Sequence, residues 1–221
     1  MTRSSSSFAR SSRSSGDGCT KSSTSPIPTS TGAPYVLHAS AGARYPFHAV
    51  RDRDSLSLGN VTATVWHAPG HTPEHLAPVV TDRACAEEPW LIFTGHTLMV
   101  GDLGRTELAA SAEEGARALA ASAARLRTLS DFVQVLPGAF SGSICGRGLS
   151  GNPFSTIGFE RRFNPAFRVT DTEALVAMML QDIPPRPPRA AETRAVNMGV
   201  AQHTHIDSTH DARPGTMQSS P

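Results

Sequence analysis

The most informative part of the chain runs Val65-Trp66-His67-Ala68-Pro69-Gly70-His71-Thr72-Pro73-Glu74-His75. The apolar residues at its start predict a strand, and Pro69-Gly70 predicts a tight turn directly after it. Its three histidines have helical spacing, but a helix is excluded because Pro69 and Pro73 lack a backbone donor and Gly70 is entropically unfavourable. We therefore place His71 in a loop at a strand end, where scaffolds often hold ligands for a metal or a substrate. A solvated or capping histidine is the alternative.

Short apolar segments on both sides of this stretch predict further strands. Leu56 to Val65 alternates apolar and polar residues, and Gly59-Asn60 in its middle predicts a hairpin. Other strands are expected at residues 35–38, 76–81, 90–94, 97–100 and 132–136. Together they predict a sheet.

Two helices are predicted from capping signals. Ser111 to Glu114 forms a capping box, and the apolar stripe that follows it consists of Ala116, Leu119, Ala123 and Leu126. A second helix is expected after Thr170 to Glu173, and Pro184-Pro185 stops it. Short strands with helices segregated between them predict an α+β fold, a sheet covered by helices.

Length and composition indicate one domain with polar tails. The chain has 221 residues and 38% hydrophobic residues, below the usual share of roughly 45–50%. The deficit lies at the two ends. Residues 1–33 are Ser-rich and predicted to be disordered, residues 34–183 form the domain, and residues 184–221 form a Pro-rich and polar tail with disorder beyond about residue 199.

Charge and cysteine usage exclude several classes of partner. The formal net charge is +1, so no strong field attracts nucleic acid or an acidic membrane surface. Cys19, Cys85 and Cys145 are odd in number and far apart, which favours a reducing compartment, and we expect a cytoplasmic protein. No apolar run reaches the length of a transmembrane helix.

Several motifs in one order resemble a known family. They are Ala68 to His75, Leu91 to Asp102, Gly104 to Leu108, Leu136 to Gly138, Cys145 to Arg147, and Ser155 to Pro165. This series resembles the metallo-β-lactamase superfamily, and within it the branch of hydroxyacylglutathione hydrolases (type II glyoxalases) and persulfide dioxygenases. The resemblance covers about residues 34 to 198. It implies a four-layer αββα sandwich with the site at one edge, and we expect this chain to hold a partial, N-terminally incomplete sandwich that lacks the first strands.

The resemblance also implies a ligand set. The family binds metal through an H-x-H-x-D-H motif, the histidine of the PGHT loop, an aspartate and usually a late histidine. His71 matches the PGHT position, whereas His96 stands where the aspartate would be. The H-x-H-x-D-H motif is absent from residues 1–66, and the late position falls near Ala139. His71 and His96 are thus the candidate ligands for zinc or iron. Candidate supporting or substrate-contacting residues are His75, Asp102 and Arg105.

Two imidazoles fall short of a catalytic metal site. Catalytic zinc takes three protein ligands and a water, and an oxygenase-type iron takes two histidines and a carboxylate. Asp102 is the nearest carboxylate in sequence to His96, and a strand-end polar role is the alternative for His96. The tail carries His203, His205 and Asp207, an H-x-H-x-D pattern at the wrong end of the chain. Chance in a polar tail is the preferred interpretation over a permuted ligand set, because no strand precedes it to hold the geometry.

Three functions remain open. The first is a metal-dependent hydrolase-like enzyme of the thioester hydrolase or persulfide dioxygenase type, impaired by the missing motif and acting on a small-molecule thioester or persulfide. The second is a non-catalytic truncated remnant, and the third is a binding module without chemistry. The ligand count separates the first from the others. Arg147, Arg161 and Arg162 are either contacts for an anionic substrate or surface partners of Glu160 or Asp171.

Overall fold

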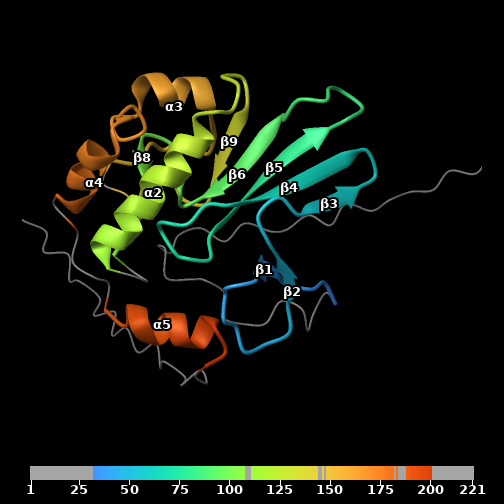
Figure 1. Ribbon diagram of the computed structural model, residues 1–221, viewed down its shortest axis with the longest axis horizontal. Coiled ribbons are helices and arrows are strands. Elements are labelled where there is room, and N and C mark those ends of the chain that lie inside the picture. The colour runs from blue at the N-terminus through green and yellow to red at the C-terminus, as the bar shows by residue number, and fades with distance from the viewer. Residues whose placement is uncertain are drawn as a thin grey trace, which may run out of the picture.

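A six-stranded sheet is the largest element of the structure, a computed structural model that describes residues 32–107, 111–143, 146, 148–181, 183 and 188–200. The strand order is β10-β9-β6-β5-β4-β3 (Figure 1). These strands are β3 (Ser55–Leu58), β4 (Val61–His67), β5 (Leu76–Asp82), β6 (Leu91–Gly95), β9 (Gln134–Pro137) and β10 (Ser155–Thr156). Neighbours are antiparallel except β6 and β9, which run parallel. The predicted hairpin is confirmed as β3 and β4, joined at Gly59-Asn60.

Two small sheets flank the large one. Strand β1 (Val36–His38) pairs in parallel with β2 (His48–Val50), and β7 (Leu98–Met99) pairs antiparallel with β8 (Asp102–Leu103). The strands β2, β8 and β10 were not predicted, because two or three residues are too few to show an alternating pattern.

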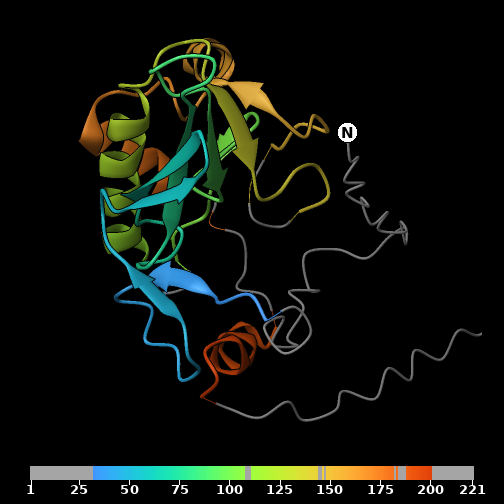
Figure 2. The same cartoon turned by 90° about the vertical axis from the view of Figure 1, so that its right-hand side faces the viewer.

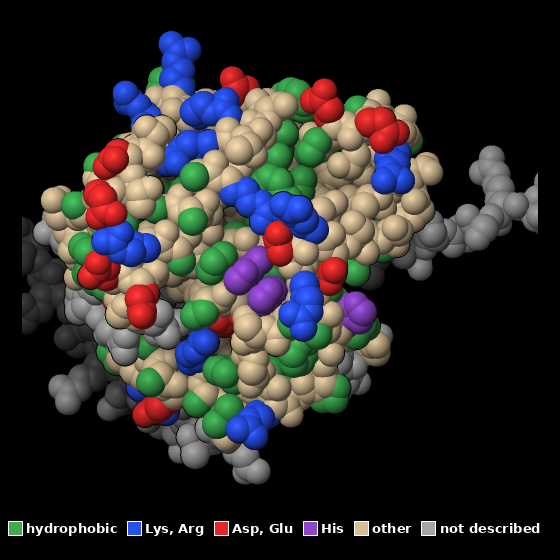
Figure 3. Space-filling model, in the orientation of Figure 1, with side chains coloured by type: hydrophobic (Ala, Val, Ile, Leu, Met, Phe, Trp, Pro, Cys, Tyr) green, Lys and Arg blue, Asp and Glu red, His purple; other side chains and the backbone are tan. Residues whose placement is uncertain are grey.

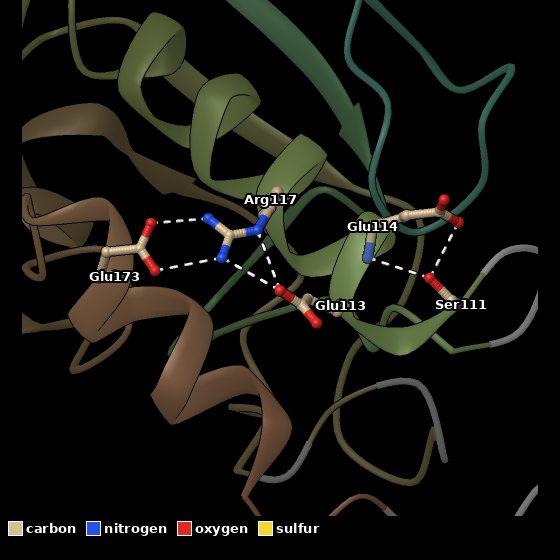
Figure 4. Close-up of polar contacts among 5 residues, drawn as sticks. All are labelled: Ser111, Glu113, Glu114, Arg117 and Glu173. Carbon is tan, nitrogen blue, oxygen red and sulfur yellow. Dashed lines mark hydrogen bonds and ion pairs between the residues drawn. The ribbon is translucent and has the colours of Figure 1, made fainter.

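The main helix, α2 (Ala112–Leu126), lies against one face of the sheet (Figures 1 and 2). Its predicted capping residue is confirmed: the Ser111 hydroxyl accepts a hydrogen bond from the Glu114 backbone N–H and donates one to the Glu114 carboxylate (Figure 4). Its apolar stripe is buried against the sheet and against α4 (Thr172–Leu180), the second predicted helix. The mixed α+β fold is therefore confirmed.

Two further helices were not predicted. Helix α3 (Ile157–Phe163) follows β10, and helix α5 (Ala190–Asn197) lies within the segment expected to be a polar tail. Tertiary contacts hold this helix: Arg194 pairs with Glu74 at 3.2 Å, and the Arg44 N–H donates to the Met198 carbonyl at 2.7 Å. The disorder predicted for residues 1–31 and 201–221 lies outside the described residues.

The core lies between α2 and one face of the sheet. Alternate strand residues point into it, including Val79, Ile92 and Val135, which pair with one another across adjacent strands and are all buried. The opposite face carries Leu91, Phe93 and the other alternate positions, and apart from the buried Val65 its apolar side chains keep part of their surface exposed. In the described part of the chain, no helix is long and apolar enough to cross a membrane.

Candidate functional site

Three strand ends bring the candidate residues to one edge of the sheet. Strands β4 and β6 both run antiparallel to β5, and β9 runs parallel to β6. Their carboxyl ends therefore meet at the same edge. The loop after β4 carries His71, the turn after β6 carries His96, and the end of β9 leads into Gly138. This explains why histidines 25 residues apart in sequence lie side by side.

The two candidate ligands are in direct contact. Nδ1 of His96 lies 2.9 Å from Nε2 of His71, and the ring centroids are 4.6 Å apart at 64°. Nδ1 of His71 donates to the Arg105 carbonyl at 2.8 Å. In the neutral ring this leaves the lone pair of Nε2 facing Nδ1 of His96. A neutral His96 ring carries one N–H, which serves either this contact or the hydrogen bond to the Gly138 backbone. The two ring nitrogens thus face each other at hydrogen-bonding distance.

Burial keeps both rings neutral. It lowers the pKa of His71 to about 4, with a smaller contribution from the neighbouring His96. Burial also lowers the pKa of His96, against an opposing hydrogen bond to the Gly138 backbone. Neutral imidazole is the protonation state that binds a metal ion. The protonation states of the pair therefore suit a metal ligand.

His75 holds the turn that carries His96 in place. Its Nε2 accepts the His96 backbone N–H at 3.1 Å, and its Nδ1 lies 3.2 Å from the Thr97 hydroxyl, which donates to the Ala68 carbonyl at 3.1 Å. The Thr97 oxygen therefore accepts from Nδ1–H, and both ring nitrogens of His75 are occupied. Burial, followed by the charges of His71 and His96, lowers its pKa to about 3. The ring is a neutral brace between the loop and the β6 end.

Helix α2 holds the loop that carries His71. The Ser122 hydroxyl donates to the Pro69 carbonyl at 2.7 Å. Gly70 has φ +145°, and a Cβ built on it would lie 2.6 Å from the Leu119 Cα. Such contact with a helix backbone leaves room for glycine alone. The Pro-Gly turn and the helix thus fit each other closely.

Asp102 and Arg105, the other candidates, lie in the polar segment behind His71. Arg105 is buried and forms an ion pair with Glu107, and its backbone carbonyl accepts the hydrogen bond from His71. Asp102 is also buried, on β8, where its carboxylate accepts the Leu103 N–H at 2.8 Å. Both therefore occupy structured positions near the pair.

The described residues do not complete a catalytic metal site. Within them, no group of three or more His, Cys, Asp or Glu side chains is arranged to hold a metal ion. Asp102 therefore does not join His71 and His96 as a third ligand. Catalytic zinc needs three protein ligands, and the iron triad needs a carboxylate beside two histidines. Two imidazoles at hydrogen-bonding distance fit neither requirement. The tail residues His203, His205 and Asp207 lie outside the described residues.

The arginines that were candidates for an anionic substrate have other partners. Arg161 forms an ion pair with Asp131 and donates to the carbonyls of Arg127 and Leu129. The predicted surface pairing was right in kind, but the partner is Asp131, because α3 lies over the residues that precede β9. Arg162 lies over the ring of Phe163, and Arg147 is outside the described residues.

A second histidine pair was missed by the sequence analysis. His38 and His67 stack with ring centroids 3.9 Å apart between the ends of β1 and β4, and histidine side chains reach the surface of this face beside charged groups (Figure 3). Asp52 accepts the His67 backbone N–H and pairs with Arg125 of α2. Because His38 precedes His67 by 29 residues, no pattern of neighbouring residues predicts this pair.

Comparisons with known proteins were made by sequence and by structure. No protein-family model matches the chain. An uncharacterized protein of Mycobacterium tuberculosis is 36% identical over 137 residues, which are 60% of this chain and 54% of that protein. One from Mycobacterium leprae is 37% identical over 115 residues, 52% of this chain and 44% of the other. The chain thus spans about half the length of the curated relatives it matches.

Two solved structures are similar over most of the chain. A metallo-β-lactamase from Staphylococcus aureus has a TM-score of 0.73 at 29% identity, covering 81% of this chain and 54% of its own. ETHE1 from Myxococcus xanthus has a TM-score of 0.63 at 26% identity, covering 79% of this chain and 70% of its own. Both agree with the fold that the motifs predicted.

Proposed function

Because this chain has the fold of the metallo-β-lactamase superfamily, we propose that it is a hydrolase-like protein of that superfamily with an impaired metal site. The proposed type is thioester hydrolase or persulfide dioxygenase, which rests on the order of the sequence motifs and is supported by the likeness to ETHE1. A small-molecule thioester or persulfide would be the substrate. The observation that carries the impairment is the direct contact between His71 and His96.

That contact limits what the two histidines can do. Two metal–nitrogen bonds of about 2.0–2.1 Å at a tetrahedral angle place the nitrogens roughly 3.3 Å apart. The nitrogens of His71 and His96 are 2.9 Å apart, within hydrogen-bonding distance. Binding a metal between them therefore means moving the two rings apart. With only two protein ligands to offset that cost, we expect weak binding of zinc or iron and slow or absent turnover.

A binding module without chemistry is the second candidate, and one observation favours it. In the described structure every ring nitrogen of His71 and His75 has a hydrogen-bonding partner. The site is therefore stable as a set of neutral side chains, and the fold needs no metal to satisfy it. Such a site can present its strand-end loops to a ligand without activating water or oxygen.

The test is the metal content of the purified, untagged full chain. His203, His205 and His210 are first changed to alanine, because a histidine-rich tail binds zinc or nickel adventitiously. After exposure to zinc or iron and dialysis, we expect well under one metal per chain and background rates on thioesters and persulfides. His71→Ala lowers any residual binding further, whereas His48→Ala, an exposed residue of β2, leaves it unchanged. One or two firmly held metals with turnover would refute the impaired site.

A further inference from the structure

One face of the large sheet is apolar and lies opposite α2. The register places Phe93 opposite Leu136 and Val80 opposite Leu91, and on the other side Ala63 opposite Val80. Residues paired in this way point to the same side of a sheet. The apolar positions on this face, here called the outer face, are Leu56, Leu58, Val61, Ala63, Val65, Pro78, Val80, Leu91, Phe93 and Leu136.

The outer face keeps large apolar side chains in contact with solvent. Leu58 is 71% exposed and Phe93 47% exposed, Val65 is buried, and the other apolar residues of the face are partly buried. Figure 2 shows α2 against the opposite side of the sheet. A monomeric protein rarely exposes a contiguous apolar surface of this size, and such a surface marks an interface. We therefore expect the apolar side chains of the outer face to be buried against another surface, here called the cover.

The remaining parts of this chain offer no matching surface. Residues 1–31 contain mainly Ser, Thr, Arg and Gly, with Met1, Phe8 and Ile27 as isolated large apolar residues, and residues 201–221 contain only Ile206 and Met217 of that kind. Neither segment has an alternating apolar pattern that could pack across six strands. These two segments therefore do not match the outer face.

We propose that the cover is a second copy of this chain, stacked outer face to outer face about a two-fold axis. Sheets pack in this way about 10 Å apart with their strands nearly aligned, as in β-sandwiches. A two-fold interface uses the same patch on both copies, so each apolar row finds an apolar row. The dimer has the layer order helix, sheet, sheet, helix.

Charge and area both agree with self-association. Among the strand positions on the outer face, Asp82 is the acidic one, and it lies at the end of β5, where it accepts the Ala84 N–H. No like charges therefore face each other at the centre of the dimer. The six strands contain 29 residues. At about 3.4 Å per residue and about 4.8 Å between strands, they give each copy a face of roughly 400–500 Å². Two copies bury on the order of 1,000 Å², the lower end of specific interfaces.

The experiment is sedimentation equilibrium of the full chain from about 1 to 200 µM, a range chosen for an interface at the lower end of the specific class. We expect a mass that rises with concentration toward twice 23.4 kDa. Phe93→Lys at the centre of the face and Leu58→Lys on the edge strand each raise the dissociation constant at least tenfold. Leu58 is the more exposed of the two, so its variant decides the question if Phe93→Lys does not fold.

The matched control is Phe163→Lys, at a phenylalanine on α3 outside the sheet that is 55% exposed, and this variant dimerises like the unchanged chain. A chain that remains monomeric at 200 µM overturns the proposal, whether the outer face then binds an apolar dye or is covered by the chain's own ends. Dimers that survive both Leu58→Lys and Phe93→Lys overturn it as well. His71→Ala should dimerise normally, so this result is independent of the proposed metal site.

Discussion

The ring of His75 accepts a hydrogen bond from the backbone N–H of His96, with 3.1 Å between the two nitrogens. This contact joins the loop after β4 to the turn after β6. A Cβ on Gly95 would collide with the same ring, so the turn can approach it only with glycine at that position. His75, the third histidine of the motif, thus positions His96 beside His71. It is a supporting residue and not a third candidate ligand.

Loss of this brace should destabilise the fold. In His75→Ala, the His96 N–H loses its acceptor and a cavity replaces the ring, which together cost about 1–3 kcal/mol of unfolding free energy. Urea unfolding followed by circular dichroism measures the change. His48→Ala removes an exposed histidine from β2 and should change stability by less than about 0.5 kcal/mol. Equal stability of the two variants would contradict the stabilising role of His75.

Stability should fall as the solution is acidified below neutral pH. The pKa values of His71 and His75 are about 4 and about 3 in the folded chain, below the ordinary value of 6.5. Between these values the unfolded chain binds protons that the folded chain does not, so stability is present above pH 6.5 and is lost as the pH falls. Each histidine contributes a slope of up to about 1.4 kcal/mol per pH unit.

Urea midpoints between pH 7.5 and pH 4.5 test this dependence. The unchanged chain should lose stability steadily in that window, whereas His75→Gln should show a shallower dependence because one titrating ring is gone. Parallel curves for the two proteins would mean that His75 is protonated equally in both states.

Gly70→Ala should be far more damaging than Gly59→Ala. Both glycines have positive φ, +145° and +66°, so both substitutions strain the backbone by about 1 kcal/mol or more. At Gly59 the new methyl group meets nothing within 4 Å, whereas at Gly70 it lies 2.6 Å from the Leu119 Cα. Thermal and urea unfolding should show a loss at Gly70 that exceeds the loss at Gly59 by at least about 2 kcal/mol. Similar losses would show that the loop can move away from α2.

Loss of the N-cap of α2 should lower the stability of the fold. Ser111 caps the helix, while Arg117 on the next turns joins Glu113 of the same helix to Glu173 of α4 (Figure 4). Ser111→Ala should cost about 1 kcal/mol, as is usual for a lost N-cap. Ser57→Ala, at an exposed residue of β3, serves as the control and should be nearly neutral. The Arg117 ion pairs lie on the surface, so the stability lost when they are removed should become smaller as salt is added. The stability lost in Ser111→Ala should not depend on salt.

Sequence reasoning was most successful where the signal was local. The turn at Pro69-Gly70, the hairpin at Gly59-Asn60 and the cap at Ser111 each depend on a few adjacent residues, and the structure has all three. Helix α5 escaped prediction because its own segment is polar and close to a Pro-rich run. What holds it is a pair of distant contacts, from Arg194 to Glu74 and from Arg44 to Met198.

By itself the sequence determined that His71 lies in a strand-end loop and that the chain has an α+β fold resembling the metallo-β-lactamase superfamily. Only the tertiary structure decided that the rings of His71 and His96 lie within hydrogen-bonding distance of each other. It also decided that the carbonyl of Arg105, 34 residues away from His71, accepts a hydrogen bond from the His71 ring. The reason is that these contacts depend on strand order and register. Antiparallel β5 between β4 and β6 brings their carboxyl ends together, and no pattern of neighbouring residues encodes that arrangement.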